Sequence, residues 1–338
     1  MKKLLWIGVV LVCISAQVFA GGGKESETKK NGETAAQAKM GKTAFPIVIN
    51  TMGIDVTFKK EPERVFPLNF ALAELLVTLG LENKIVSMAP GMYSIDDVLP
   101  EHRDGFKNIH VLEGLKGGVP SFETVLKANP YFVYGVSYSF FPSNCGEASG
   151  YLEQGIAVYA SEGTFVEDAT IENTYNDIRN IGKIFNVQEK AEALIQDMQR
   201  KIASVKAAID TVEPVKVAVV DGIREADLFS IGGTGLENKL LAAAGARNLF
   251  DYVQRHYFRL SFEEFINKNP DVVVIFERDE KGDGQKKINF VKNKPEFAGI
   301  SAVKNNKFVI VSSSSMFPSL QNADAVVHLA KALHPDKF

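Results

Sequence analysis

Two groups of side chains in this sequence have the chemistry to bind a ligand, and they fall in different halves of the chain. Loops of the first half carry aromatic residues, namely Tyr93, Tyr138, Phe140 and Phe141. Loops of the second half carry cationic residues, namely Arg224, Arg255, His256, Arg259 and Arg278. Planar rings stack and make cation–π contacts, and guanidinium groups donate charge-assisted hydrogen bonds. Such a combination suits a large anionic chelate.

Direct binding of a bare metal ion has less support in the sequence. A zinc or manganese site needs several histidine and carboxylate ligands that converge on one point. Of the five histidines, only His256 falls in one of these ligand-binding loops, and His328 lies in the predicted terminal helix. We therefore predict no metal ligands, although a single histidine or tyrosine could still ligate haem iron.

An enzymatic function also has little support. The glycine-rich run at 232–235 could cradle a phosphate, but it lacks the Lys-Ser/Thr ending of a P-loop and the spacing of a dinucleotide fingerprint. The serines at 312–315 fit a polar loop after a strand better than a set of nucleophiles, and no Gly-x-Ser-x-Gly elbow occurs. We predict a protein with no catalytic residues that is not an enzyme.

Apolar runs of strand length alternate with helical patterns through most of the chain. In the first half, strands are predicted at 47–50, 55–58, 65–68, 85–88 and 132–134, and helices at 71–79 and 122–128. In the second half, strands are predicted at 215–220, 272–276 and 308–311, and helices at 236–244, 262–267 and 323–333. This alternation predicts an α/β fold with central, mainly parallel sheets.

One internal repeat indicates two lobes of similar, Rossmann-like construction. Residues 121–130 and 261–270 both begin with Ser-Phe-Glu, continue with a helical pattern and end in Asn-Pro before an apolar run. The pattern predicts a serine N-cap, a short helix stopped by proline, and a buried strand. Ser261 and Glu264 also have the spacing of a capping box.

A long helix is predicted between the two halves. Residues 171–209 lack proline and have a helical pattern, with a break predicted near Gly182 and Asn186. The part at 188–209 would be about 33 Å long at 1.5 Å per residue, and its apolar residues recur at the spacing of one buried stripe. It could be an ordinary surface helix of one large domain, but its length also suits a rigid connection between two lobes.

We accordingly place the N-terminal lobe at 45–167, the connecting helices at 168–211 and the C-terminal lobe at 212–338. Residues 21–44 contain almost no large apolar side chain, which predicts a flexible leader. Residues 1–20 have the basic start, apolar run and small-residue site of a secretory signal peptide. The apolar run is shorter than the roughly 20 residues of a spanning helix.

The N-terminal segment predicts export, with cleavage after Ala20. Lipid attachment at Cys13 is an alternative, although Val12 stands where a lipobox normally has a small residue. Cys145 is the other cysteine, so the exported chain cannot form an intramolecular disulfide. The net charge of −3 and the lack of a lysine- and arginine-rich block give no sign of nucleic acid binding.

An ordered set of short motifs extends over nearly the whole chain after the leader. It includes the opening hairpin, the segments 61–65, 74–81, 84–86, 155–158 and 182–195, the two Asn-Pro strands, the turn at 302–304 and the ending at 333–335. Together these motifs resemble the helical-backbone class of periplasmic binding proteins, the iron-siderophore and cobalamin type. The resemblance implies two α/β lobes joined by a long helix, with a ligand held between them at the carboxyl ends of the strands.

The resemblance also implies a function and partners. The chain would be a periplasmic, monomeric solute-binding protein that captures a ferric siderophore or similar iron chelate and delivers it to an ABC permease and its ATPase at the inner membrane. Haem, cobalamin and oxyanion binders share the scaffold and remain alternatives. No intrinsic cofactor is implied. In the family an exposed glutamate on each lobe docks to the permease, and Glu74 and Glu237 fall in the matching segments.

Overall fold

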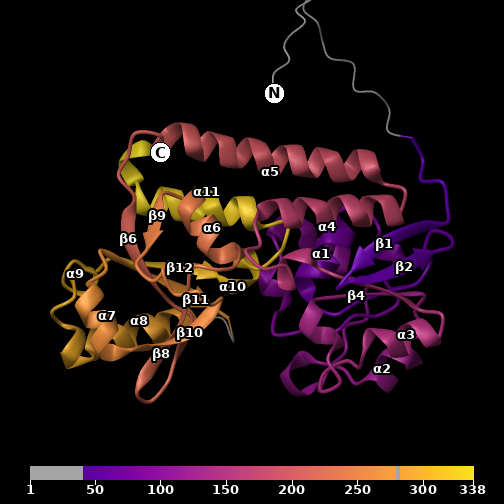
Figure 1. The fold of residues 1–338 in the computed structure, drawn as a ribbon, viewed down its shortest axis with the longest axis horizontal. Helices are drawn as coiled ribbons and strands as arrows, with labels where there is room; N and C mark the ends of the chain where they lie inside the picture. Colours follow the sequence, from indigo (N-terminus) through magenta and orange to yellow (C-terminus); the bar gives the residue numbers. More distant parts are fainter. Residues whose placement is uncertain (1–40, 279–281) are drawn as a thin grey trace, which may run out of the picture. The chain divides into compact units, whose positions relative to one another are not determined.

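A computed structural model describes residues 41–278 and 282–338 of the chain (Figure 1). The predicted signal peptide, Cys13 and most of the predicted leader lie outside the described residues. Residues 40–338 form one compact unit. Within the described ranges, no helix combines the length and the apolar character needed to cross a bilayer.

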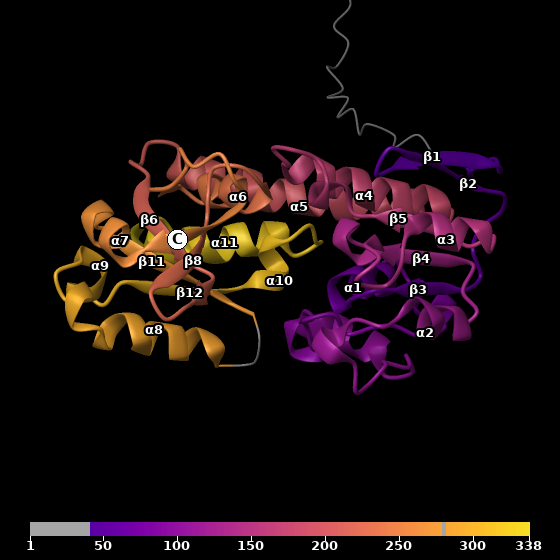
Figure 2. The same cartoon turned by 60° about the horizontal axis from the view of Figure 1, so that its bottom comes forward.

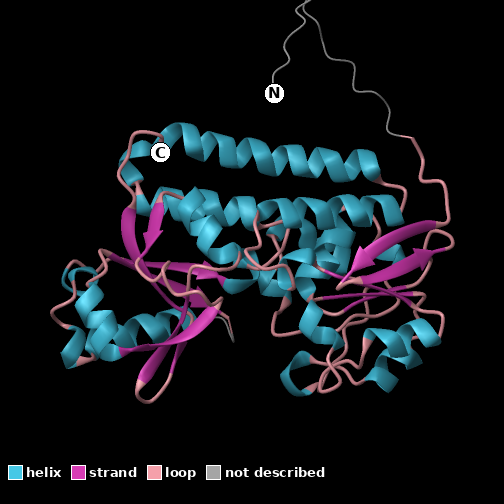
Figure 3. Cartoon of the chain, viewed as in Figure 1, coloured by secondary structure: helices cyan, strands magenta, loops and turns pink. Residues whose placement is uncertain are grey.

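The elements from β1 to β5, here called the N-lobe, are arranged around a parallel sheet in the order β3-β4-β5 (Figure 3). All four residues of β4 are buried, as expected for a strand covered on both faces. An antiparallel hairpin of β1 and β2 precedes the sheet. The bounds are β1 Ile47–Thr51, β2 Ile54–Phe58, β3 Val65–Pro67, α1 Phe70–Thr78, α2 Phe122–Lys127, β4 Phe132–Gly135, α3 Ala148–Glu153 and β5 Ala157–Ala160.

The predicted strand at 85–88 is wrong. Ile85 pairs with Val65, and Met88 pairs with Val111, but each contact is an isolated bridge. Ile85 meets β3, but Val111 lies outside any strand, so no continuous ladder forms.

The elements from β6 to α11, here called the C-lobe, contain a parallel sheet in the order β12-β11-β6-β9. A small antiparallel sheet of β7, β8 and β10, which the sequence analysis did not predict, lies beside it. The strands are β6 Val215–Val220, β7 Gly222–Ile223, β8 Asp227–Ile231, β9 Ala246–Asn248, β10 Tyr257–Ser261, β11 Val272–Glu277 and β12 Phe308–Ser312. The helices are α6 Leu236–Ala243, α7 Phe262–Lys268, α8 Asp283–Asn293, α9 Ser301–Lys304, α10 Ser313–Met316 and α11 Asn322–Leu333.

The internal repeat forms the same local structure in both lobes. The Ser121 and Ser261 hydroxyls cap α2 and α7 by accepting backbone N–H groups three residues later, at 3.3 and 3.1 Å. Asn129 and Asn269 both adopt the left-handed conformation that asparagine tolerates, after which β4 and β11 begin. The predicted capping box at Ser261 forms only in part, because the Glu264 carboxylate accepts the Tyr252 hydroxyl.

The predicted long helix and its break are confirmed. Helix α4 spans Ile171–Ile184 and α5 spans Gln188–Ile209. Asn186 reverses the chain with a φ of 56°. A Cβ at Gly182 would approach the Ala191 Cβ to 2.7 Å, so glycine permits the close packing of the two helices.

Helix α5 runs alongside both lobes (Figure 2) and contributes side chains to both cores. Ala191, Ile195 and Met198 pack into the N-lobe core, whereas Val205 packs into the C-lobe core. Helix α11 lies beside α5, and Lys201 of α5 forms a 2.7 Å ion pair with Asp324 of α11. The lobes are therefore joined through buried helix contacts and not through a flexible linker.

Helix α4 also buries an aspartate in the N-lobe. Asp177 Oδ1 accepts hydrogen bonds from the Tyr159 hydroxyl at 2.6 Å and from the Glu162 amide at 2.9 Å. Its other oxygen, Oδ2, has no hydrogen-bond partner in the described part of the chain. Burial raises the pKa of Asp177 to about 8, although both hydrogen bonds oppose the shift.

The raised pKa predicts that Asp177 makes the protein less stable as the pH rises. Its stabilising contribution is fully present below the unfolded-state pKa near 4 and is lost as the pH rises toward 8, because the folded state retains a proton that the unfolded state releases. Asp177→Asn removes this titration. As the pH rises over that range, we expect the free energy of unfolding of the variant to increase relative to that of wild type by up to about 1.4 kcal/mol per pH unit.

Denaturant unfolding between pH 5 and pH 8.5 measures this difference. Asp104→Asn, which changes an aspartate with a side chain 86% exposed, is the control and should follow the wild-type pH dependence. If the free energy of unfolding depended on pH in the same way for wild type and Asp177→Asn, the raised pKa of Asp177 would be contradicted.

Candidate functional site

The site lies where the parallel strands of both lobes end. In the C-lobe, Asp221 follows β6, Arg278 follows β11, and Ser312 is the last residue of β12. Since these strands are parallel and paired in register, their carboxyl ends meet at one edge of the sheet. In the N-lobe, the corresponding end of β4 leads into the loop that carries Tyr138. Open α/β sheets place ligands at such edges.

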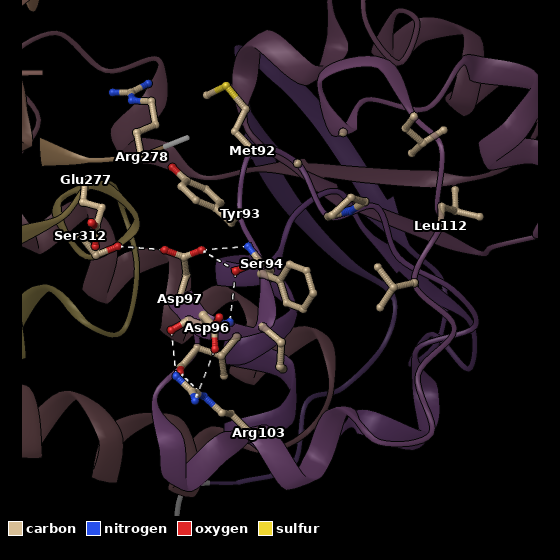
Figure 4. Close-up of a pocket in the computed structure, with 18 of the residues that line it drawn as sticks. Met92, Tyr93, Ser94, Asp96, Asp97, Arg103, Leu112, Glu277, Arg278 and Ser312 are labelled. Carbon is tan, nitrogen blue, oxygen red and sulfur yellow. Dashed lines mark hydrogen bonds and ion pairs between the residues drawn. The ribbon is translucent and has the colours of Figure 1, made fainter. Parts of the chain in front are cut away.

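A cavity of about 1230 Å³, here called the large cavity, lies between the lobes at this edge (Figure 4). The N-lobe lines it with residues 90–100 and most of residues 111–118. The C-lobe contributes Glu277, Arg278, Ser312 and Gln321. Both lobes therefore present side chains to the same space.

Two glycines allow the N-lobe loops of the large cavity to cross. The Gly91 amide donates to the Gly118 carbonyl at 3.2 Å, and both residues have a positive φ. A Cβ at Gly118 would come within 1.5 Å of the Gly91 carbonyl oxygen. Only glycine fits at this crossing, which fixes the loop that carries Tyr93.

Polar contacts join the lobes at the base of the large cavity. The Ser312 hydroxyl donates to Asp97 Oδ1 at 3.1 Å (Figure 4). The Gln321 side-chain amide donates to the Asp97 carbonyl at 2.8 Å and to Glu74 Oε2 at 2.6 Å. These bonds hold the two lining segments beside each other.

A second cavity of about 300 Å³, the small cavity, shares Met92 and Arg278 with the large one. Its other lining residues are Tyr138, Gly163, Thr164, Leu236, Glu237, His256, Tyr257, Phe317 and Pro318. Aromatic rings dominate this set. The His256 and Tyr257 rings stack with centroids 4.2 Å apart.

Arg278 is the central charged group of the site. Its Nε and Nη2 atoms donate to Asp221 Oδ1 at 3.1 and 2.8 Å. The guanidinium also lies 5.5 Å from the Phe317 ring centroid and 6.0 Å from that of Tyr257. Burial alone would lower the pKa of Arg278, but the Asp221 carboxylate and the nearby tyrosines outweigh burial and raise it. Arg278 is therefore a fixed cation whose charge is compensated by Asp221.

The tyrosines of the site remain neutral phenols. Burial raises the pKa of Tyr93 and Tyr138 above the ordinary tyrosine value, and nearby Arg278 only partly opposes the shift. The pKa of Tyr257 is raised in the same way by burial and by the Glu237 carboxylate. These side chains offer ring faces and hydroxyl hydrogen bonds to a ligand.

The structure brings four of the predicted ligand-binding residues to the cavities. Tyr93 lines the large cavity, Tyr138 and His256 line the small one, and Arg278 lines both. Phe140 does not, because its ring is buried in the N-lobe core against Tyr151.

Three predicted arginines also lie elsewhere. Arg224, Arg255 and Arg259 are exposed, and none lines either cavity. Arg259 is on β10 of the small antiparallel sheet, where it lies 3.6 Å from Asp227 of β8. Of the predicted cationic residues, Arg278 and His256 are therefore the two that line the cavities.

Sequence reasoning missed several lining residues. Tyr257 and Phe317 supply ring faces beside Arg278, and Met92 lies at the junction of the cavities. Tyr257 follows His256 directly and could have been found by its position. Phe317 had no such signal, because it comes after the short helix α10, which the sequence analysis treated as a polar loop.

Glu74 and Glu237 are not the exposed docking carboxylates that we expected. Both side chains are buried, with exposed fractions of 0% and 1%. Glu74 Oε1 accepts the Leu99 amide at 2.9 Å and contacts His102 Nδ1 at 2.8 Å, in addition to its bond from Gln321. Both carboxylates are taken up by contacts within the protein, so neither presents a carboxylate to a partner protein.

Glu237 supports the wall of the small cavity. Its Oε1 accepts the Tyr257 hydroxyl at 2.7 Å, and its Oε2 lies 2.6 Å from His256 Nε2. This contact fixes the orientation of the His256 ring. Among the described residues, no group of three or more histidine, cysteine or acidic side chains is arranged to hold a metal ion.

These features define a two-lobed binding protein with its site between the lobes. Residues 68–314 match the family of periplasmic binding proteins, and the chain belongs to that family. It is therefore a solute-binding protein and not an enzyme, and it is the substrate-binding component of an ABC transporter, which includes a permease and an ATPase.

Characterised and uncharacterised relatives support this assignment. The uncharacterised ABC transporter substrate-binding lipoprotein YvrC of Bacillus subtilis is 25% identical over 344 residues, which cover 100% of this chain and 99% of the relative. The vitamin B12-binding protein of Vibrio parahaemolyticus is 21% identical over 231 residues, 68% of this chain and 76% of the relative. The petrobactin-binding protein YclQ of Bacillus subtilis is 21% identical over 337 residues, with 98% of both chains covered.

Solved structures share the fold. A periplasmic binding protein from Veillonella parvula superposes with a TM-score of 0.77 at 24% identity, covering 86% of this chain and 98% of its own. The structure of an ABC-type Fe³⁺-hydroxamate transport system from Saccharomonospora viridis gives a TM-score of 0.74 at 23% identity, covering 86% and 99%. Both likenesses confirm the predicted fold class.

The burial of Glu74 predicts a large effect on stability. Glu74→Ala leaves the Leu99 amide without its acceptor in a buried environment and removes one of the two hydrogen bonds that the Gln321 side-chain amide donates. We expect the free energy of unfolding to fall by about 3 kcal/mol, with Glu74→Gln losing less because the amide keeps one acceptor oxygen. Thermal or denaturant unfolding of the purified variants measures this loss.

Glu82→Ala is the matched control, since Glu82 is exposed just beyond α1 and its carboxylate accepts no hydrogen bond from the described part of the chain. Its unfolding free energy should stay within about 0.5 kcal/mol of wild type. A Glu74→Ala protein as stable as the control would restore Glu74 as a candidate for docking.

Proposed function

We propose that this chain captures a bulky metal chelate, such as a ferric siderophore, in the cavities between its lobes and delivers it to the permease. The observation that carries this proposal is the size and character of the site. The large cavity, at about 1230 Å³, exceeds the roughly 300–1,000 Å³ typical of small-molecule pockets. A single metal ion or a small oxyanion would leave most of it empty.

The lining chemistry also supports a chelate with an organic surface. Tyr93, Tyr257 and Phe317 offer ring faces on both sides of the site, and Arg278 offers N–H groups between them. Rings of this kind stack on planar or apolar ligand surfaces, while a few polar groups orient the ligand. The names of relatives that bind petrobactin or vitamin B12 are consistent with such a cargo.

Cobalamin and haem remain the second candidates, because both are bulky chelates with extended apolar faces. Tyr93, Tyr138 and His256 line the cavities and are the side chains there whose chemistry suits haem iron. A bare divalent metal and a small oxyanion fit the cavity least well.

We propose an extracytoplasmic location for the protein. Support comes from the family, from the lipoprotein relative and from the signal-like sequence at 1–20. The lipoprotein relative also strengthens the alternative that Cys13 carries a lipid, in place of cleavage after Ala20. The permease would then meet the protein at the outer face of the membrane.

Ring truncation in each lobe tests the site. Titration calorimetry with ferrioxamine B, haem, cyanocobalamin and Zn²⁺ should identify a bulky chelate that binds with a stoichiometry of one and is not altered chemically. Tyr93→Ala in the N-lobe and Phe317→Ala in the C-lobe should each weaken binding of that chelate about tenfold or more, through loss of buried ring contact.

Tyr131→Ala is the matched control, because Tyr131 is 45% exposed and precedes β4 at the opposite end of the N-lobe sheet. Its affinity should equal that of wild type. The proposal is wrong if only Zn²⁺ binds, or if the two ring truncations leave the affinity for every bound chelate unchanged.

A further inference from the structure

The charged residues that line the large cavity are not balanced. Two are arginines, Arg103 and Arg278, and four are acidic. The acidic residues are Asp96, Asp97, Glu113 and Glu277. No lysine or histidine lines this cavity within the described ranges.

Both arginines already have carboxylate partners from the chain. Arg278 donates two hydrogen bonds to buried Asp221, which lies behind it. Arg103 lies 3.8 Å from Asp96 and donates to the carbonyl oxygens of Val98 and Asp96. Neither guanidinium is an uncompensated positive charge that a ligand anion would neutralise.

The other three carboxylates of the large cavity have no cationic partner among the described residues. Asp97 accepts hydrogen bonds from Ser312 and from the Ser94 amide, which are neutral donors. Glu277 accepts the amides of Gly282 and Gly284. Glu113 is exposed on the cavity wall. The cavity as a whole therefore carries residual negative charge.

The aromatic lining acts in the same direction. Tyr93 lines the large cavity, and Tyr257 and Phe317 line the adjoining small cavity. Ring faces carry the negative part of the ring quadrupole, which attracts cations and repels anions. Arg278, placed over two of these rings, is held there together with Asp221 and adds no net charge.

We infer that the ligand is a neutral or cationic chelate, and that the large cavity selects against anionic chelates of the same size. This inference rests on the proposed function and replaces the anionic ligand expected from the sequence. The residues that carry the discrimination are Asp97, Glu113 and Glu277.

Two matched series of probes test the inference by changing only the charge of a pendant group. The first is ferrioxamine B, which is cationic through its free amine, with its neutral N-acetyl and anionic N-succinyl derivatives. The second is neutral cyanocobalamin, its anionic monocarboxylic acid and the cationic aminoethyl amide of that acid. Dissociation constants are measured by titration at low ionic strength, where charge effects are least screened.

In the series that binds, we expect the cationic and neutral members to bind at least about tenfold more tightly than the anionic member, with the difference shrinking at high salt. Glu113→Gln, which removes one charge from the exposed wall, should reduce the difference in affinity between the cationic and the anionic member. Glu153→Gln, at an exposed position that lines neither cavity, should leave it unchanged.

The outcomes separate the two proposals. Equal affinities across a series, or tightest binding of the anionic member, would overturn the charge inference while leaving chelate binding intact. Binding of no member of either series would instead count against the proposed function itself.

Discussion

Helix α5 buries one apolar stripe in two cores, and the site exists because of this constraint. Its first half is packed in the N-lobe through Ile195 and Met198, and its last turns are packed in the C-lobe through Val205. A helix cannot bend at its centre without losing backbone hydrogen bonds, so it sets the spacing of the lobes. Helix α11 reinforces this, because Ala323 near its start packs in the N-lobe core while its remainder packs in the C-lobe core.

With the lobes held in this way, the carboxyl ends of two parallel sheets face a shared space. The N-lobe fills its side with the loops that cross at Gly91 and Gly118, and the C-lobe fills its side with the groups after β6, β11 and β12. The buried glutamates belong to the same construction. Glu74 ties α1 to Gln321 of the other lobe, and Glu237 holds His256 and Tyr257 in place. Carboxylates that looked like docking groups are thus part of the frame of the site.

The sequence predicted most of the fold because periodicity and capping are local properties. The break near Asn186 and the capped repeats at Ser121 and Ser261 were all readable from neighbouring residues. The small sheet of β7, β8 and β10 was not predicted, since β7 spans only Gly222–Ile223 and β10 pairs with β8 across the intervening helix α6 and strand β9.

The site was only partly predictable for the same reason. Tyr93 and Arg278 follow elements whose ends could be located, so they were found. Arg259 lies on β10 of the unpredicted sheet and Arg224 in the turn between β7 and β8, and both are exposed. The negative charge of the cavity was missed because it depends on the pairing of Arg278 with Asp221. These two residues are 57 positions apart in the sequence. Charge balance in a cleft depends on such pairings, which a single sequence does not display.

The central claim is that one ligand contacts both lobes while α5 keeps them in place. Hydrogen–deuterium exchange with and without a bound chelate, ferrioxamine B or cyanocobalamin, tests it most directly. We predict simultaneous protection of residues 90–98 in the N-lobe and of residues 254–258 and 312–318 in the C-lobe, with exchange in α5 unchanged. Protection confined to one lobe, or a change in α5 with none at the cavities, would contradict the account.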